Sequence, residues 1–383
     1  MKSDTIGTNN WSILLNMKQF LQEAWRSSGF EVPTPIQEKA IPLILEAKDV
    51  IAESPTGTGK TLAYLLPLLD KIDTSKKNVQ VMILSPSHEL SMQIFQTIEQ
   101  WTKGSDIRSL PIIGGANIKR QLVNLRDHPH IIVGTTGRLL ELIRMKKIKM
   151  HQVKTIVVDE FDVLIAQEHV ANLKSIIKTT LRDRQILFFS ATLSEGTEKI
   201  GRELMKEPET IQIKEDEGLS SNTEHIAILC EEREKIQILR KIIRSADIKA
   251  LVFVSNSRDI SVIADKLRYE GLNLGVLTGD SKKNQRKEAL RKFRIGEFPM
   301  LIATDLAARG LDIEGLTHVI NWDLPRYSKQ YLHRSGRTGR MGAVGTVISI
   351  VTKGEESDLK KKTNKLGISL KKKRLFKGEL VDR

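Results

Sequence analysis

The sequence predicts an α/β protein made of two tandem, doubly wound parallel-sheet domains. Short runs rich in Val and Ile alternate with longer segments whose apolar residues recur at helical spacing. Runs that are apolar throughout are typical of strands buried on both faces of a parallel sheet, with helices as the connections. The alternation pauses at residues 215–222, a polar stretch containing glycine, which is typical of a linker. We therefore expect one domain over residues 1–212, a linker over 213–222 and a second domain over 223–355.

The predicted strands are short apolar runs, each followed by a polar loop. In the first domain they span 49–52, 79–84, 131–133, 155–158 and 185–189, and in the second 250–254, 300–303 and 318–321. Helical spacing is clearest at 62–69, 89–101 and 260–269. We expect 356–383 to be a basic tail, and because the last ~20 residues lack strong apolar periodicity, we expect these to be partly disordered.

The composition is that of a folded chain with a basic surface. Of 383 residues, 40% are hydrophobic and 28% are charged, which excludes a wholly disordered chain. The formal net charge is +14, and residues 211–383 carry 34 Lys and Arg against 23 Asp and Glu. A charge this basic favours a polyanionic partner, either nucleic acid or an anionic membrane face, over a role in solubility alone.

Two further features bear on location. No apolar run approaches the roughly 18 residues of a membrane-spanning helix, and the N-terminal region lacks the apolar core of a secretion signal. Cys230 is the one cysteine of the sequence, which excludes an internal disulfide and a multi-thiolate metal site. A reducing environment suits this usage, and we expect a cytoplasmic protein without membrane association.

A glycine-rich loop stands between the predicted strand 49–52 and the predicted helix 62–69. Residues 54–61 read Ser-Pro-Thr-Gly-Thr-Gly-Lys-Thr, a P-loop pattern with serine in place of the first glycine. Glycines let backbone N–H groups face a phosphate, and the helix N-terminus adds a positive partial charge. In this pattern Lys60 reaches the β- and γ-phosphates and Thr61 places its hydroxyl on Mg²⁺. The predicted nucleotide-binding residues of the loop are Ser54, Thr56, Gly57, Thr58, Gly59, Lys60 and Thr61.

Two adjacent carboxylates, Asp159 and Glu160, close the predicted strand 155–158. Side chains at the carboxyl end of a parallel strand face the crevice where ligands bind in such sheets. One carboxylate can hold Mg²⁺, mostly through water, and the other can orient or deprotonate an attacking water. Taken singly, the loop at 54–61 could be a plain turn and the acidic pair a plain helix start. Together they favour hydrolysis of a nucleoside triphosphate.

Further motifs occur in a fixed order through most of the chain. Residues 29–37 read Gly-Phe-x-x-Pro-Thr-Pro-Ile-Gln, 190–192 read Ser-Ala-Thr, 303–312 read Ala-Thr-Asp-x-x-Ala-Arg-Gly-Leu-Asp, and 333–340 read His-Arg-x-Gly-Arg-x-x-Arg. With these motifs and Asp-Glu-x-Asp at 159–162, the chain resembles the DEAD-box ATP-dependent RNA helicases of helicase superfamily 2. The resemblance implies that both domains are RecA-like.

The resemblance also implies roles for individual residues. Phe30 would stack on adenine and Gln37 would hydrogen-bond the base edge, which favours ATP over GTP. Asp159 would hold Mg²⁺ with Thr61, and Glu160 would position the attacking water. The implied catalytic residues are Lys60, Glu160 and the arginine fingers Arg337 and Arg340, and Asp312 would contact the ribose. The residues that would couple hydrolysis to RNA are Ser190, Thr192, Asp305 and His333. Those that would bind RNA are Pro86, Ser87, Gly115, Thr135, Arg138, Arg286 and Thr304.

Four positions depart from the family pattern. His88 stands where the family has arginine, Thr136 where it has proline, Lys283 where it has glutamine and Phe161 where it has alanine. A histidine is neutral at most cytosolic pH values, so a permanent cation is lost. We therefore expect intact ATP chemistry but a weaker RNA grip by the first domain. Sequence-independent phosphate attraction by the basic second domain and tail would compensate.

The function implied by the resemblance is that of an enzyme, an ATP-dependent RNA helicase that uses ATP and Mg²⁺. It would hydrolyse ATP in the cleft between the domains when RNA is bound, and locally separate short RNA duplexes or remodel RNA–protein complexes. It would recognise mostly the RNA backbone and 2′-hydroxyls, and we expect a monomer. The alternatives are a DNA-activated ATPase, a non-catalytic RNA-binding scaffold and a membrane-surface ATPase. The retained motif residues disfavour the first two, and no amphipathic anchor or lipidation signal supports the third.

Overall fold

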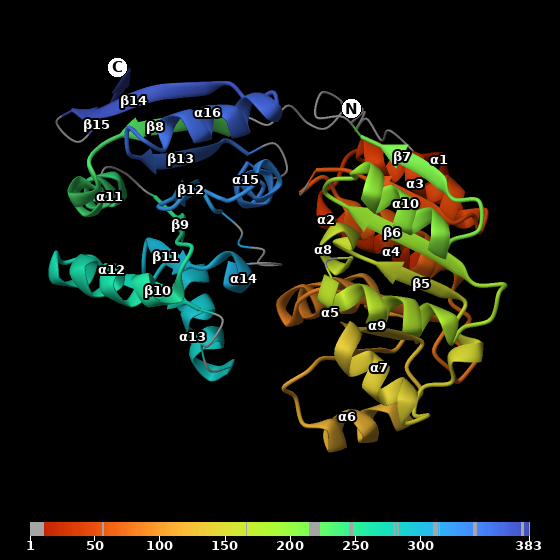
Figure 1. Ribbon diagram of the computed structural model, residues 1–383. Helices are drawn as coiled ribbons and strands as arrows, with labels where there is room; N and C mark the ends of the chain where they lie inside the picture. Colours follow the sequence, from red (N-terminus) through yellow and green to blue (C-terminus); the bar gives the residue numbers. More distant parts are fainter. Residues whose placement is uncertain are drawn as a thin grey trace, which may run out of the picture. The chain divides into compact units, whose positions relative to one another are not determined.

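The computed structural model describes residues 11–55, 57–165, 167–213, 223–244, 248–278, 281, 283–308, 313, 315–339, 343–376 and 379–382. The chain divides into two compact units, Met1–Gly218 and Leu219–Arg383 (Figure 1). Except for Ile213, the predicted linker over 213–222 lies outside the described residues. Each unit is an α/β domain with its own sheet and its own hydrophobic core.

The first unit is built on a parallel sheet of seven strands in the order β3-β4-β2-β5-β6-β1-β7. The strands are β1 (Val50–Glu53), β2 (Val81–Ser85), β3 (Ser109–Ile112), β4 (Ile131–Thr135), β5 (Thr155–Val158), β6 (Gln185–Ser190) and β7 (Glu209–Gln212). The predicted strands of this domain are confirmed. β3 and β7 were not predicted, because both are short edge strands without a continuous apolar run, and β3 contains Pro111.

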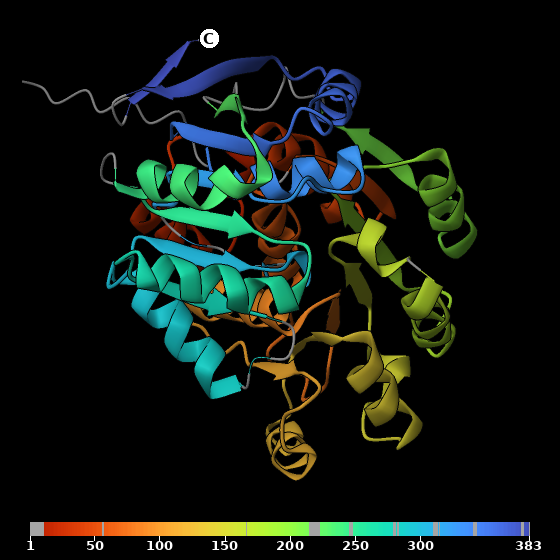
Figure 2. The same cartoon turned by 60° about the vertical axis from the view of Figure 1, so that its left-hand side comes forward.

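Helices cover both faces of this sheet (Figure 1 and Figure 2). They are α1 (Ser12–Leu15), α2 (Gln19–Ser28), α3 (Pro35–Leu45), α4 (Lys60–Lys71), α5 (His88–Trp101), α6 (Ile118–Asn124), α7 (Thr136–Arg144), α8 (Phe161–Leu164), α9 (Gln167–Lys178) and α10 (Glu195–Leu204). Ile83 of β2 faces a core that α2 to α5 complete, and its neighbours Met82 and Leu84 face a core that α7 to α9 complete. The alternation follows from the period of two along a strand.

The second unit is built on eight strands in the order β10-β11-β9-β12-β13-β8-β14-β15, all parallel except the last pair. The strands are β8 (Thr223–Leu229), β9 (Ala250–Phe253), β10 (Leu274–Leu277), β11 (Met300–Ala303), β12 (His318–Asn321), β13 (Gly345–Val351), β14 (Leu370–Phe376) and β15 (Glu379–Asp382). The helices are α11 (Lys235–Arg244), α12 (Ser257–Tyr269), α13 (Lys283–Arg294), α14 (Asp305–Ala308), α15 (Ser328–Ser335) and α16 (Glu356–Lys365). The three predicted strands of this domain are confirmed.

The C-terminal residues differ from the sequence prediction. The predicted basic tail begins with a regular helix, α16. The expectation that its last residues are partly disordered is wrong for their described part, because β14 pairs in parallel with β8. The charge run also has carboxylate partners: Lys371 and Lys373 pair with Glu224, and Lys372 pairs with Glu356. β14 lies between β8 and β15, and a strand so rich in lysine has no apolar run to reveal it in the sequence.

A buried polar pair joins β8 to α15. Nδ1 of the His225 imidazole lies 2.9 Å from the Tyr331 hydroxyl, and both side chains are buried. Burial lowers the pKa of His225 to about 4. Because an unfolded chain restores the ordinary pKa of about 6.5, protonation of His225 favours the unfolded state.

The second unit should therefore lose stability as the pH falls from about 6.5 toward 4. His225 has the lower pKa in the folded state, so its contribution to the free energy of unfolding is complete above about pH 6.5. This contribution is lost as the pH falls, because the unfolded chain binds the proton at a higher pH than the folded chain does. At about pH 5 we expect His225 to account for a loss of about 2 kcal/mol in the free energy of unfolding. Hydrogen exchange of β12 and β13 amides in urea measures this loss against His225→Gln, which keeps a polar partner for Tyr331. A wild type that loses no more stability than His225→Gln contradicts the assignment.

Candidate active site

The predicted motifs of the first unit gather at the carboxyl edge of its parallel sheet. The P-loop (residues 54–61), Asp159 and Ser190 lie at the ends of β1, β5 and β6, which are neighbours in the sheet. The residues predicted to bind RNA follow β2, β3 and β4, which form the other neighbouring group. One half of the sheet thus carries the predicted ATP motifs, and the other half carries the predicted RNA motifs.

The P-loop curls around the ammonium group of Lys60. Lys60 Nζ donates to the carbonyl oxygens of Ser54 and Pro55 at 2.6 and 2.8 Å. The Ser54 hydroxyl lies 2.6 Å from the Thr58 hydroxyl, so serine at the first glycine position braces the loop from within. The loop leads directly into α4, whose N-terminal N–H groups and the Lys60 ammonium form a cradle for an anion.

Gln37 ties the predicted adenine motif to the end of the P-loop. Its amide oxygen accepts from the Thr34 N–H at 3.0 Å, and its amide nitrogen donates to the Gly59 carbonyl at 3.3 Å. Gly59 has a φ of +91°, and a Cβ atom there would lie 2.6 Å from the Gln37 amide nitrogen, so this position requires glycine. One N–H and one oxygen lone pair of the Gln37 amide remain for a base.

Phe30 belongs to an aromatic cluster on the same side of the sheet. Its half-buried ring lies 5.6 Å from Trp25, edge to face, and 6.4 Å from Trp101, nearly parallel at 14°. Trp11 extends the cluster by contacting Trp25 at 5.6 Å. These contacts fix the orientation of the ring that is predicted to stack on adenine.

Asp159 is a buried carboxylate held by a hydroxyl and a backbone donor. The Tyr64 hydroxyl donates to Oδ2 at 2.9 Å, and the Glu160 N–H donates to Oδ1 at 2.9 Å. Burial, and then the Glu160 charge, raises the pKa of Asp159 to about 6, against the lowering effect of Lys60. A negative charge is therefore costly here until a cation compensates it. The Thr61 side chain also interacts with Tyr64, so this tyrosine lies beside both predicted Mg²⁺ ligands.

The donor set fits Mg²⁺. Thr61 and Asp159 supply a hydroxyl and a carboxylate, which are the hard oxygen ligands that Mg²⁺ prefers. Within the described ranges, no group of three or more His, Cys, Asp or Glu residues could hold a metal by itself. An ion with one or two protein ligands, and with phosphates and water completing its shell, agrees with both observations.

Glu160 stands in a strained backbone conformation. Its φ and ψ are both 49°, the left-handed region, at the N-terminus of α8. A residue with a side chain occupies this region at a cost, and such residues cluster at active sites where the surrounding structure holds them. The turn fixes the direction in which the carboxylate leaves the end of β5.

Hydrogen bonds connect both ATP motifs of the first unit to the segment Ser190–Thr192. The Ser54 N–H donates to the Ser190 carbonyl at 3.0 Å. The Thr192 hydroxyl donates to Asp162 Oδ2 at 3.3 Å, and the Ser190 hydroxyl donates to the Thr192 carbonyl at 2.7 Å. Of the predicted coupling residues, Ser190 is therefore in direct contact with the P-loop and Thr192 with the acidic motif.

Phe161, which replaces the family's alanine, fills the core beneath the acidic motif. Its buried ring stacks on Phe188, with centroids 4.0 Å apart and planes at 17°. Gly201 of α10 makes room for the pair, because a Cβ atom there would lie 2.9 Å from Ile51 and 3.5 Å from each ring. The larger side chain is thus accommodated by a glycine on the facing helix.

The RNA half of the first unit is organised around the double-glycine loop after β3. Pro86 and Ser87 lead from β2 into α5, and the Ser87 hydroxyl accepts a backbone N–H of the first helical turn at 3.1 Å. The His88 ring then lies against the loop, since a Cβ atom on Gly114 would lie 3.2 Å from His88 Nε2, and one on Gly115 would lie 3.9 Å from Cε1. Histidine at the family's arginine position therefore packs beside the loop backbone.

Arg138 holds the same loop from the side of α7, which begins after Thr135. Its guanidinium donates to the Ala116 carbonyl at 3.1 Å and to the Gln121 amide oxygen at 3.0 Å. Nε pairs with Glu141 at 2.9 Å, and the Arg138 side chain is 13% exposed. In this arrangement Arg138 positions the loop that would approach RNA.

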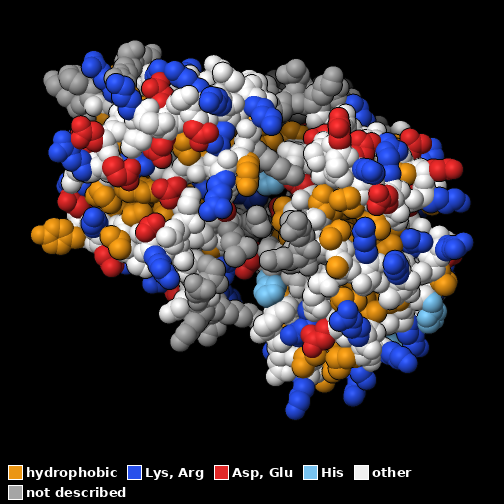
Figure 3. Space-filling model, in the orientation of Figure 1, with side chains coloured by type: hydrophobic (Ala, Val, Ile, Leu, Met, Phe, Trp, Pro, Cys, Tyr) orange, Lys and Arg blue, Asp and Glu red, His pale blue; other side chains and the backbone are white. Residues whose placement is uncertain are grey.

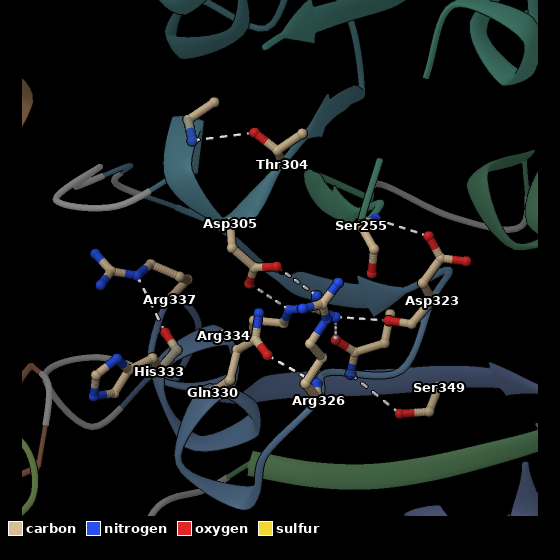
Figure 4. A network of polar contacts seen from close by, with 12 residues as sticks. Ser255, Thr304, Asp305, Asp323, Arg326, Gln330, His333, Arg334, Arg337 and Ser349 are labelled. Atoms are coloured by element: carbon tan, nitrogen blue, oxygen red, sulfur yellow. Dashed lines mark hydrogen bonds and ion pairs between the residues drawn. The ribbon is translucent and has the colours of Figure 1, made fainter. Parts of the chain in front are cut away.

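Arg334, on α15, is a buried hub of the second unit (Figure 4). It makes a bidentate ion pair with Asp305, both N···O distances being 2.7 Å, and it donates to the Asn321 side chain at 2.9 Å and to the Asp323 carbonyl at 2.7 Å. The guanidinium also lies 4.9 Å over the Phe253 ring, and the side chain is 1% exposed. The two motifs of the second unit are thereby joined.

The other described motif residues of the second unit lie near this hub. Arg337 Nε donates to the His333 carbonyl at 3.3 Å, and its guanidinium points away from the network (Figure 4). The Thr304 hydroxyl accepts the Ala307 N–H at 3.2 Å, and Arg286 donates to the Ala307 carbonyl. Two predicted RNA-binding residues therefore converge on α14.

Part of the predicted site lies outside the described residues, namely Thr56, Asp312, Arg340 and the side chain of Lys283. The sequence motifs did not point to Tyr64 or to the role of Arg334. Tyr64 stands four residues after Lys60, so helical spacing places it on the face of α4 that begins at the P-loop. Its contact with Asp159, 95 residues away, has no signal in the sequence.

Removing the guanidinium of Arg334 should strongly destabilise the second unit. Arg334→Met leaves the Asp305 carboxylate and the Asn321 amide without their partner, and breaking a buried ion pair from one side costs about 3–5 kcal/mol of unfolding free energy. Hydrogen exchange of β12 amides in urea measures the loss. Arg326→Met, at an exposed position just before α15, is the matched control and should stay within about 0.5 kcal/mol of the wild type. Equal stability of the two variants contradicts the role of Arg334.

Comparisons with known proteins agree with the motifs. The family model described as DEAD/DEAH box helicase matches residues 34–200, and the helicase conserved C-terminal domain matches residues 234–342. The chain is 52% identical over 363 residues to the probable ATP-dependent RNA helicase YfmL of Bacillus subtilis (strain 168), covering 95% of this chain and 96% of that one. It is 49% identical over 370 residues to the DEAD-box ATP-dependent RNA helicase CshC of Bacillus cereus, covering 97% and 95%.

Solved structures show the same architecture. S. cerevisiae Dbp5 bound to RNA and ADP BeF3 matches with a TM-score of 0.87 at 28% identity, over 94% of each chain. A DEAD box protein from the hyperthermophile Methanococcus jannaschii matches with a TM-score of 0.57 at 31% identity, over 94% of this chain and 98% of that one. With its motif order and its two parallel-sheet units, the chain therefore belongs to the DEAD-box ATP-dependent RNA helicases and has their pair of RecA-like domains.

Proposed function

We propose that this enzyme couples RNA binding to ATP hydrolysis with groups from both units, and that it separates short RNA duplexes or remodels RNA–protein complexes. The observation that carries the proposal is the sorting of motifs along the first sheet, with the ATP motifs after β1, β5 and β6 and the RNA motifs after β2, β3 and β4. Because the two groups share one sheet, a displacement in one half is transmitted to the other through packed strands.

The first unit supplies the nucleotide site in this proposal. Phe30 and Gln37 select adenine, and the P-loop backbone with Lys60 binds the phosphates. Thr61 and Asp159 would hold Mg²⁺, which when bound neutralises charge on the β- and γ-phosphate oxygens. The buried carboxylate of Asp159, with its raised pKa, supports this role because a nearby cation removes the cost of its charge.

Hydrolysis then needs a base and a source of positive charge. Glu160 orients the attacking water and accepts its proton, from a position fixed by the strained turn after β5. Arg337 and Arg340 of the second unit stabilise the charge on the transferring phosphoryl group. Neither unit holds the full set, so turnover requires both. If ATP and RNA both bind the catalytically competent arrangement more tightly, each promotes the binding of the other.

RNA recognition in this proposal relies on the backbone. The predicted contacts are Pro86, Ser87, Gly115, Thr135 and Arg138 in the first unit, and Arg286 and Thr304 in the second. Small residues, loop N–H groups and arginines at strand ends suit phosphates and 2′-hydroxyls, and they read little base sequence. None of the described helices is long and apolar enough to cross a bilayer. The cytoplasmic location and the monomeric state stay predictions.

Strand displacement tests the proposal. An RNA duplex of about 10 base pairs with a single-stranded extension should separate when ATP and Mg²⁺ are added, and a DNA duplex of the same sequence should not. Fluorescence of a labelled strand measures the separation, and parallel phosphate release measures turnover. Equal activation of turnover by RNA and DNA would favour a DNA-activated ATPase. Binding of RNA without any turnover would favour a non-catalytic scaffold.

A further inference from the structure

α16 and β14 form an exposed basic surface at one edge of the second sheet. We call this the C-terminal basic surface, and its exposed members are Lys360, Lys361, Lys365, Lys371, Lys372 and Arg374. Figure 3, drawn in the orientation of Figure 1, shows Lys and Arg side chains along the part of the molecule where α16 and β14 lie. No large hydrophobic side chain is exposed among the described residues of α16 and β14.

Shared carboxylates order the surface, and one of them, Glu224, pairs with both Lys371 and Lys373. Glu356 lies 3.1 Å from the Lys360 ammonium and 2.5 Å from that of Lys372, so it ties the helix to the strand and cancels one charge of two. Within the described part of the chain, the ammonium groups of Lys361 and Lys365 have no hydrogen-bond or ion-pair partner. They stand four residues apart and so share one face of α16. The surface therefore keeps most of its positive charge.

The C-terminal basic surface is distant from the predicted RNA contacts of the same unit. Arg286 lies on α13, which packs on β10, and Thr304 precedes α14, which follows β11. In the strand order, β10 and β14 are six steps apart, which at about 4.8 Å per step is roughly 29 Å. The C-terminal basic surface and the predicted RNA contacts thus lie toward opposite edges of one sheet.

We propose that the C-terminal basic surface is a second nucleic-acid-binding site, which holds a flanking segment of the bound RNA by its phosphates. This inference rests on the proposed function, because it adds a second contact to the same ligand. A stacked strand advances about 3.4 Å per phosphate, so the separation of roughly 29 Å corresponds to about nine nucleotides. Two linked contacts raise the apparent affinity through effective concentration. A membrane is the weaker partner, because interfacial helices need an exposed apolar face.

RNAs of different length distinguish the two sites, because a short RNA reaches only one of them and a long RNA reaches both. Oligouridines of about 6 and about 30 nucleotides are compared as activators of ATP turnover, and a Lys361→Gln/Lys365→Gln variant is compared with the wild type across a salt series. We expect the variant to need about 5–10 times more of the long RNA for half-activation, with a salt slope shallower by about 1.4, because two single-strand phosphate contacts are lost. The short RNA should activate both proteins equally, and turnover without RNA should be unchanged. Lys241→Gln/Lys266→Gln removes the same charge from exposed positions on α11 and α12 and should have no effect.

Three outcomes overturn the inference. If wild type and variant need the same concentration of the long RNA for half-activation, the surface does not bind RNA. If the variant also needs more of the short RNA for half-activation, by the same factor, the lysines affect the predicted RNA contacts or the fold instead. Binding of the wild type, but not of the variant, to phosphatidylglycerol vesicles, with RNA activation unchanged, would assign the surface to lipid headgroups. Should no RNA activate the wild type, the proposed function fails, and fluorescence anisotropy of the long RNA still tests the surface directly.

Discussion

Replacing Arg337 by Ala is expected to lower RNA-stimulated ATP turnover by about 10³–10⁵-fold, the effect of an arginine finger on phosphoryl transfer. The guanidinium of Arg337 points away from the buried network around Arg334, so it does not belong to the hub that holds the second unit together (Figure 4). The effect should therefore fall on the rate constant of turnover, with little change in the nucleotide affinity of the first unit. Phosphate release at saturating ATP and RNA measures the rate constant.

Two further variants show whether the effect is specific to the guanidinium of Arg337. Arg337→Lys keeps the charge but loses the planar fork, and it should stay severely impaired because a point charge does not match two phosphoryl oxygens. Arg326→Ala, at an exposed arginine outside the site, should turn over ATP like the wild type. Turnover of Arg337→Ala within about tenfold of the wild type would remove Arg337 from the mechanism.

Replacing Glu160 by Gln should lower turnover by about 10²–10⁴-fold, because an amide can still hydrogen-bond a water but cannot accept its proton. ATP binding should persist, since Lys60, Thr61 and Asp159 are intact. The variant should also hold RNA more persistently in the presence of ATP, because the state before hydrolysis accumulates. Stopped-flow phosphate release and equilibrium binding of a fluorescent ATP analogue separate the two effects.

The control for Glu160 is Glu195→Gln, which neutralises an exposed carboxylate in the first turn of α10. It should leave both turnover and nucleotide binding unchanged. A Glu160→Gln protein that releases phosphate at the wild-type rate would show that another group deprotonates the water. A variant that no longer binds ATP would show instead that Glu160 supports the nucleotide site.

Most of the fold could be predicted because buried parallel strands have a strong local signal. Runs such as 131–133 and 155–158 are apolar throughout, and flanking loops mark their ends. The strands that were missed include edge strands, namely β3, β7, β10 and β15, but also the interior strands β8, β13 and β14. Several of them carry polar residues within the strand, so they have no continuous apolar run. β14 is the clearest case, since its lysines are compatible with a strand only because Glu224 and Glu356 lie beside them.

The residues of the site were likewise predictable where they form short sequence motifs, and not where they depend on contacts between distant elements. The P-loop, the acidic pair and Gln37 could be found because their function depends on short, fixed spacings. The contacts of Asp159 with Tyr64 and of Arg334 with Asp305 join separate elements, so only the folded chain reveals them. The Phe161 substitution is similar, because its meaning depends on a glycine in α10 that the motif does not include.

We expect ATP hydrolysis by this enzyme to depend on both units and to be promoted by RNA. The most direct test is the steady-state rate of phosphate release by the full chain at a subsaturating ATP concentration, measured with and without single-stranded RNA. Reciprocal coupling of the two ligands predicts that RNA raises this rate by at least about fivefold. An identical rate with and without RNA would contradict the claim.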